Sequence, residues 1–555
     1  MSKERVNSQP QQFLPLPRAQ VIVTLSCVLL TMFLAALDQT IVSTATPRII
    51  ADLGGFDRYT WITTGYLVAS TTAAPIVGRL SDMYGRKWFF VGSVFVFIIG
   101  SILCGVSHDM TQLIFFRVLQ GLGGGTIMAV TFIVIADLFP PEERGKYMGM
   151  LAACFGLSSV IGPTLGGFLT DNLSWHWVFF VNVPLAGPVI FLLIKYFPDN
   201  QGATDPIKRR IDYVGMILLI ISVVGLMIGL SWGGVQYGWG SPQVVSVLSI
   251  GVVASAVLIV VELKAPNPTL ELALFRERMV SIGLVLTLLT GFAMFGAIIF
   301  VPLYFQGVLG ASATSSGTFL TPMMLGVVFG ATLSGQVLSR TGGHFRIQSL
   351  VGIFVLAVGV FLFTTLGNEA SFMRAVVYIV ILGFGLGSTF PTLTIAVQNF
   401  TPPESIGAAT SLTQFARTIG GLIGLSTLGS VLSSRFVARV ESDIDQAGIV
   451  VPQAVLENLK SNPRALVDSE AGTAMLKNLG LNVQSDTLVH VVGVMKGSLS
   501  GAIDDVFNVS LIVLLVALAV TVLLNKTGFR KRDGPESQAW IEYHRRVTIG
   551  GNDAK

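Results

Sequence analysis

Long apolar runs dominate this sequence, and fourteen of them are at least about 20 residues long. A helix of about 20 residues spans roughly 30 Å, the thickness of the hydrocarbon layer of a membrane. Only 12% of the 555 residues are charged, against roughly 25% in soluble domains. The sequence therefore predicts an all-α polytopic membrane protein and argues against a soluble enzyme. The predicted spans are residues 20–40, 60–80, 88–107, 111–136, 146–170, 178–197, 213–231, 243–262, 280–305, 315–338, 347–367, 372–397, 407–433 and 503–525.

The positive charges indicate how the chain crosses the membrane. Short loops on one side contain Arg79, Arg86, Lys87, Arg144, Lys146, Lys195, Lys208, Arg209, Arg210, Lys264, Arg276, Arg278, Arg340 and Arg346. The opposite short loops contain only Arg48, Arg58 and Arg374. Because Lys and Arg are retained on the cytoplasmic side, we expect both termini in the cytoplasm. The expected location is the cell membrane, plasma or inner.

One predicted outer connection, residues 434–502, is much longer than the others. Its segment 451–460 has the pattern of a short amphipathic helix, and 486–503 is expected to extend the last span outward. The sequence leaves open whether this connection is a small helical cap or a plain spacer.

An internal repeat divides the chain. A shift of 262 residues superimposes Gly121 and Gly125 on Gly383 and Gly387, and 140–145 on 402–407. We therefore predict a tail at 1–19, a six-helix bundle at 20–200 and two inserted helices at 211–262. A second six-helix bundle follows at 280–525 and includes the outer loop 434–502, before a tail at 526–555. Parallel repeats of this kind are typical of secondary transporters.

Four stretches of the sequence match motifs of a known family. They are LDQTIVSTATP (37–47), GRLSDMYGRKWFF (78–90), RVLQGLGGG (117–125) and GLSSVIGPTLGG (156–167). Together they resemble the major facilitator superfamily, in its fourteen-span drug:proton antiporter branch of multidrug efflux transporters. The resemblance implies two six-helix bundles plus two inserted helices.

The loop between spans two and three has its own chemical logic. Gly78 and Gly85 allow a tight reversal, while Asp82 can accept hydrogen bonds at a helix start and Arg86 can pair with Asp137. The resemblance implies that these residues form a latch that stabilises one access state. Alternatively, the basic residues only set the topology. The matching loop at 335–346 lacks the aspartate, so we expect a one-sided latch.

Three ionisable residues lie within predicted spans, where charge is costly and commonly functional. Asp38 is the predicted proton carrier, or alternatively a helix cap near the outer surface. The resemblance links Arg117 to proton coupling, and its alternative role is a structural hydrogen-bond hub. Arg417 is a further proton-coupling candidate that could tune the carboxylate, bind anions or extend towards the membrane surface.

The motif in span five contains small residues and a proline. The resemblance implies a pliable interface between the two halves; a kink without a mechanistic role is the alternative. The residues of this motif are Gly156, Gly162, Pro163, Gly166 and Gly167.

A substrate cavity is the least constrained expectation. Aromatic and methionine side chains suit adaptable binding of apolar or cationic molecules, although such residues more often pack between helices or face lipid. The candidates are Phe292, Phe295, Tyr304, Gln306, Met323, Phe384 and Phe390.

We therefore expect a proton-coupled exporter of lipophilic, amphipathic or cationic compounds such as drugs, working by alternating access. The alternatives are an exporter of an endogenous lipid, glycolipid or siderophore, and a transporter-like receptor or sensor. The sequence contains no P-loop and no HExxH motif, so no ATP-driven pump or enzyme is expected. We expect no cofactor beyond the proton gradient, no metal, no disulfide, no nucleic-acid partner and a monomer within the lipid bilayer.

Overall fold

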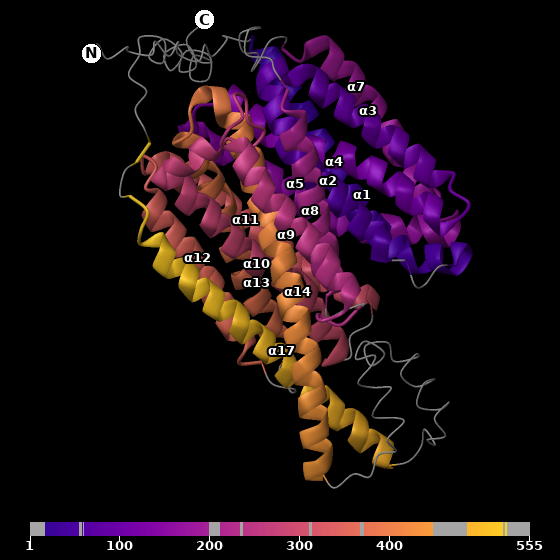
Figure 1. The fold of residues 1–555 in the computed structure, drawn as a ribbon. Helices are drawn as coiled ribbons and strands as arrows, with labels where there is room; N and C mark the ends of the chain where they lie inside the picture. The colour runs from indigo at the N-terminus through magenta and orange to yellow at the C-terminus, as the bar shows by residue number, and fades with distance from the viewer. Residues whose placement is uncertain are drawn as a thin grey trace, which may run out of the picture.

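The computed structural model describes residues 17–54, 58, 60–198, 211–233, 237–309, 313–366, 371–447, 486–525 and 528–529. Most of these residues lie in helices (Figure 1). The first part contains α1 (Arg18–Leu53), α2 (Thr60–Tyr84), α3 (Arg86–Gly105), α4 (Met110–Leu138), α5 (Pro141–Asn172), α6 (Trp177–Phe180) and α7 (Asn182–Tyr196). The second contains α8 (Tyr213–Trp232), α9 (Pro242–Glu262), η2 (Leu272–Arg276), α10 (Arg278–Gly307), α11 (Ala313–Arg340), α12 (Phe345–Phe363), α13 (Phe372–Asn399), η3 (Pro403–Ser405), α14 (Ile406–Ala447) and α17 (Asp486–Thr521).

The number of long helices agrees with the apolar runs. Within the described residues, thirteen helical segments are long and apolar enough to cross a membrane, with α6 and α7 together forming one of them. Helix α2 is a further long helix of 25 residues that includes five threonines, which lower its hydropathy. The predicted polytopic all-α fold is confirmed.

Several helices begin where the local sequence predicts. Asp109 and Ser241 accept hydrogen bonds from the backbone N–H groups of Gln112 and Val244, which caps α4 and α9. Helices α5 and α9 also have proline in their first turn, where no intrahelical N–H is needed. These local signals set the ends of the helices, and apolar burial sets their packing.

Two large apolar cores organise the helices. One is formed mainly by α1, α3, α4, α5 and α7, and the other by α10, α12, α13, α14 and α17. Helix α5 packs along α11 and α2 packs along α14, so these two pairs join the N-terminal half (α1–α7) to the C-terminal half (α10–α17). Helices α8 and α9 pair with each other, and α8 also contacts α2 and α14 (Figure 1).

Helices α14 and α17 project together beyond the other helices at one end of the molecule (Figure 1). Their extensions are held together by Arg439 and Asp505, with Nη2 and Oδ2 3.0 Å apart, and by a 2.6 Å hydrogen bond from Ser498 to Asp443. Helix α17 begins at Asp486, which confirms that the last span is extended at its N-terminal end; that this end lies outside the membrane stays a prediction. The amphipathic helix predicted at 451–460 lies outside the described residues.

Candidate functional site

Asp38 lies in the interior of α1 and its side chain is fully buried. Its Oδ2 is 2.7 Å from Nη1 of Arg117 on α4. Its Oδ1 accepts hydrogen bonds from the side-chain amides of Gln120, at 2.8 Å, and Asn182 on α7, at 2.9 Å. Because Asp38 is far from either end of α1, the alternative that it caps a helix is wrong.

Arg117 is held from several sides. Its Nε donates to the carbonyl oxygen of Ile62, and its Nη1 donates to Oε1 of Gln120 at 2.6 Å. The guanidinium carbon lies 4.4 Å from the centre of the Tyr66 ring, which adds a cation–π contact. Ser101 on α3 accepts hydrogen bonds from the amides of Gln120 and Asn182. Side chains from α1, α2, α3, α4 and α7 therefore converge on one buried carboxylate.

The cluster pairs one carboxyl group with one guanidinium. With Asp38 ionised, the carboxylate and Arg117 balance each other, and a buried ion pair of this kind is strongly destabilised when one partner loses its charge. The buried Oδ1 of Asn182 has no hydrogen-bond partner among the described residues. One acceptor of the cluster is therefore unused in this conformation.

Sequence reasoning identified Asp38 and Arg117 but missed Gln120 and Asn182. The available signal was an amide side chain inside each of two apolar runs, in RVLQGLGGG and FFVNVP. Buried amides need hydrogen-bond partners, and in this structure they share Asp38.

The second site lies where α2 meets α3. Arg86 bonds Asp82 through Nη1, at 2.5 Å, and Asp137 through Nε, at 2.9 Å. Its Nη1 also donates to Oγ of Ser81. Gly85, between the two helices, has a φ of 97°, a conformation that favours glycine. The structure thus brings together the predicted latch residues of the N-terminal half.

Asp82 also crosses to the C-terminal half. Its two carboxylate oxygens accept hydrogen bonds from the backbone N–H groups of Gly407, at 3.2 Å, and Ala408, at 2.9 Å. These are free N–H groups in the first turn of α14, where the helix dipole favours a negative charge. Gly78 lies so close to Ser411 and the carbonyl of Gly407 that a Cβ atom there would overlap them.

A related contact joins α5 to α11. Gly145 and Gly335 face each other backbone to backbone, so a Cβ on either would overlap the other helix. Beside them, the buried Arg144 donates to the carbonyls of Ala136 and Phe139, and its Nη1 donates to Gln398 of α13 at 3.3 Å. The residues at this end of the molecule therefore hold the two halves together in the present conformation.

The glycines of the α5 motif lie against two different helices, α11 and α1. Gly156 faces Val328 of α11 in the other half, whereas Gly162 and Gly166 face Thr40 and Thr44 of α1 in the same half. A Cβ at Gly167 would meet nothing within 4 Å, and Pro163 lies inside the helix. The prediction that the whole motif forms the interface between halves is wrong for Gly162 and Gly166, because the turn of the helix points them at α1.

Arg417 lies on α14, apart from the Asp38 cluster. Its guanidinium carbon is 3.8 Å from the centre of the Phe390 ring, and its Nη1 donates to Gln414 at 2.6 Å. Phe390 in turn packs against Phe132 of α4, with ring centres 5.5 Å apart. Arg417 is thus a buried cation at the boundary between the halves, where an aromatic face and an amide stabilise it.

The candidate cavity residues occupy different environments. Phe292, Tyr304 and Met323 are at most 7% exposed and pack in the apolar core of the C-terminal half. Phe295, Phe384 and Phe390 are partly buried. The side chain of Gln306 lies outside the described residues. In this conformation, Phe292, Tyr304 and Met323 are closed off from solvent.

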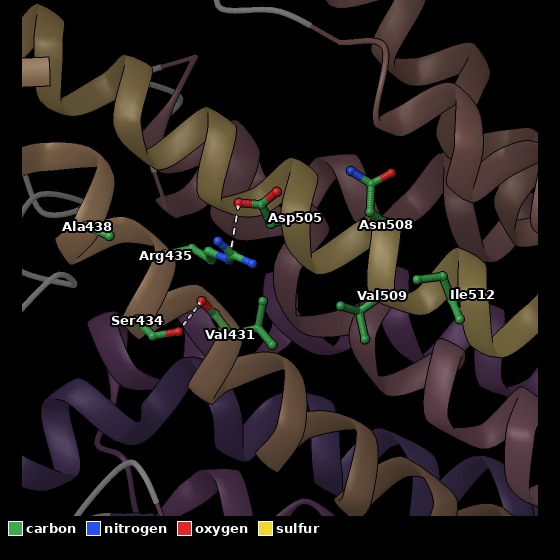
Figure 2. Close-up of a pocket in the computed structure, with 8 residues that line it drawn as sticks. All are labelled: Val431, Ser434, Arg435, Ala438, Asp505, Asn508, Val509 and Ile512. Atoms are coloured by element: carbon green, nitrogen blue, oxygen red, sulfur yellow. Dashed lines mark hydrogen bonds and ion pairs between the residues drawn. The ribbon is translucent and has the colours of Figure 1, made fainter. Parts of the chain in front are cut away.

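A pocket of about 490 Å³ lies between α14 and α17 (Figure 2). Arg435, Asp505 and Asn508 line its polar part, and Val509 and Ile512 line its apolar part. Both walls belong to the C-terminal half, so this pocket is separate from the boundary between the halves.

The fold and the buried charge cluster define a polytopic membrane transporter. The chain belongs to the Major Facilitator Superfamily, whose model matches residues 28–425. It is a transporter and not an enzyme.

Curated relatives are similar over nearly the whole chain. Multidrug transporter protein MdtP of Bacillus subtilis is 36% identical over 518 residues, covering 92% of this chain and 94% of the relative. Multidrug resistance protein 3 of the same organism is 37% identical over 495 residues, covering 89% and 93%.

Solved structures share the fold at low sequence identity. The human organic anion transporter MFSD10 matches with a TM-score of 0.56 and 14% identity, covering 90% of this chain and 100% of that one. The proton:xylose symporter XylE matches with a TM-score of 0.53 and 12% identity, covering 89% and 95%.

Proposed function

We propose that this protein is a proton-coupled exporter of lipophilic, amphipathic or cationic compounds, in the fourteen-span drug:proton antiporter branch. The observation that carries the proposal is the fully buried Asp38–Arg117 pair inside a membrane helix bundle. An ionisable residue inside the membrane is energetically costly, so those that are retained commonly have a function. Proton relay is one such function. The multidrug relatives support efflux of small compounds as the purpose.

The proton gradient is sufficient to drive such export. One charge moving across a potential of 100 mV releases about 2.3 kcal/mol, which corresponds to nearly a fifty-fold concentration ratio. Protonation of Asp38 releases Arg117 from its ion pair and changes the packing among the helices that meet there. Substrate and proton then alternate in a cycle that requires no cofactor.

The cycle also requires the two halves to separate at one end. With both termini in the cytoplasm, the contacts of Asp82 with α14 and of α5 with α11 lie at the cytoplasmic end. The structure would then represent the state closed towards the cytoplasm. Breaking these contacts opens the cytoplasmic side, while the Asp38 cluster remains within the N-terminal half.

The test is transport by the purified protein in proteoliposomes under an imposed pH gradient. The panel consists of a cationic dye, a neutral lipophilic drug and a fluorescent phospholipid. Gradient-dependent movement of the dye or drug supports the proposal. Movement of the phospholipid alone supports lipid export instead, and binding without movement of any compound supports a receptor.

A further inference from the structure

Glu262, the last residue of α9, is a buried acid outside the sites described above. It is only 3% exposed. Backbone N–H groups of Leu270 and Thr269 approach its carboxylate, but neither oxygen has a hydrogen-bond partner of regular geometry. An ionised carboxylate in such a place carries a large desolvation penalty unless it is paired. The side chain therefore requires either a bound cation or a proton.

A second carboxylate faces the same point. Asp212 precedes α8, and its Oδ1 caps that helix by accepting a 2.8 Å hydrogen bond from the N–H of Gly215. Its Oδ2 has no partner. A Cβ added at Gly215 would meet both this Oδ2 and Oε1 of Glu262. The unpartnered oxygens of the two acids therefore converge on the surface of Gly215.

The surrounding groups do not supply a free positive charge. The segment after α9 packs over the two acids, and Oγ1 of Thr269 donates to the backbone carbonyl of Asp212. Arg79 of α2 faces the pair, but it already forms an ion pair with Glu271 of the same segment. Among these described residues, the carboxylates of Asp212, Glu262 and Glu271 face one guanidinium, that of Arg79.

Two carboxylates that share a buried site cannot both ionise without strong repulsion, and one proton held between them removes it. We propose that Asp212 and Glu262 form a proton-binding site on the α8–α9 helix pair that holds one shared proton near neutral pH. This site is separate from Asp38 and does not depend on what the protein transports. It gives the inserted helices α8 and α9 a protonation state of their own.

The site is linked to the contact between the halves. Glu271 bonds Arg79, which follows Gly78 directly in the chain, and Gly78 lies against α14. Loss of the shared proton would leave two facing negative charges under the segment that carries Glu271. The protonation state of Asp212 and Glu262 therefore affects the Arg79–Glu271 ion pair, which holds α2 to the segment after α9.

The direct test is infrared spectroscopy of the full-length purified protein between pH 6 and 8. Protonated carboxyl groups absorb separately from ionised ones, so the wild-type spectrum minus the Glu262→Gln spectrum isolates this pair. We expect a protonated-carboxyl band equivalent to one group per protein, lost in Glu262→Gln. Asp212→Asn keeps the cap on α8 but removes the facing negative charge, so Glu262 should lose its proton, and the band, at a lower pH than in wild type.

The matched control is Asp171→Asn, since Asp171 is exposed and pairs only at the surface with Arg48. The protonated-carboxyl band should remain in the spectrum of Asp171→Asn. If wild type and both pair variants give the same protonated-carboxyl signal while eluting as folded protein, the two acids are ionised and the proposal is wrong. Because two variants probe the same band, failure of one to fold still leaves the other as a test.

Discussion

The carboxylate of Asp82 accepts a 2.9 Å hydrogen bond from the backbone N–H of Ala408, 326 residues later in the chain. Asp82 is also paired with Arg86, so the same side chain closes the turn between α2 and α3 and holds the first turn of α14. A single carboxylate therefore connects a local motif in one half to a helix end in the other.

Asp82→Asn should weaken this connection. Asparagine cannot pair electrostatically with Arg86 or with the dipole of α14, and a hydrogen bond to a charged group contributes about 1.5–3 kcal/mol. A loss of that size shifts the closed–open equilibrium by roughly ten-fold to a hundred-fold. Spin labels at Lys146 and Thr341, which are exposed near the Gly145–Gly335 contact, should show a longer distance in the variant.

The control for this measurement is Asp109→Asn. Asp109 caps α4 at an exposed position, and asparagine is an equally good cap, so the label distance should remain that of the wild type. An unchanged distance in Asp82→Asn as well would remove Asp82 from the latch.

Gly145→Ala should also open the α5–α11 contact, for a steric reason. The new methyl group would overlap the backbone of Gly335, and overpacking of this kind costs about 1–3 kcal/mol. We expect slower transport and a longer distance between the same labels. Gly167→Ala is the matched control, because its methyl group meets nothing within 4 Å. Equal transport by the two variants would argue against a role for this close contact.

Arg117→Lys should impair transport although it preserves the charge. The planar guanidinium of Arg117 donates hydrogen bonds to Asp38, Gln120 and the carbonyl of Ile62 at the same time. The ammonium group of lysine does not have this arrangement of donors. We expect at least about a ten-fold loss of gradient-driven transport, equivalent to about 1.4 kcal/mol. Arg48→Lys, at an exposed surface pair, should transport like the wild type. Normal transport by Arg117→Lys would show that charge alone suffices at this position.

The helices could be predicted from sequence because hydropathy is a local property. Even α2, with its five threonines, is recognisable as an apolar run at 60–80 between charged or Gly/Pro-rich breaks. Arg86 and Asp137 could be paired in advance because Asp137 lies at the cytoplasmic end of the fourth predicted span and the family resemblance implies a latch there. The contact between Asp82 and the first turn of α14 could not be predicted, because no local sequence pattern shows which helix end will lie next to which residue.

The composition of the charge cluster was only partly predictable for the same reason. Asp38 and Arg117 stand out because charge is rare in apolar runs, but their pairing with Gln120 and Asn182 depends on how α1, α4 and α7 pack. Likewise, a glycine predicts close approach without naming the neighbour, so Gly162 was assigned to the wrong interface.

The most direct test of the account is substrate transport by Asp38→Asn in proteoliposomes with an imposed pH gradient. Asparagine keeps the size of the side chain and one acceptor oxygen for Arg117, but loss of the charge costs stability, so transport is measured on variant protein that elutes and unfolds as a folded protein. We expect wild type to move a cationic dye in response to the gradient and Asp38→Asn not to move it. Gradient-driven transport by folded Asp38→Asn at the wild-type rate would contradict this expectation.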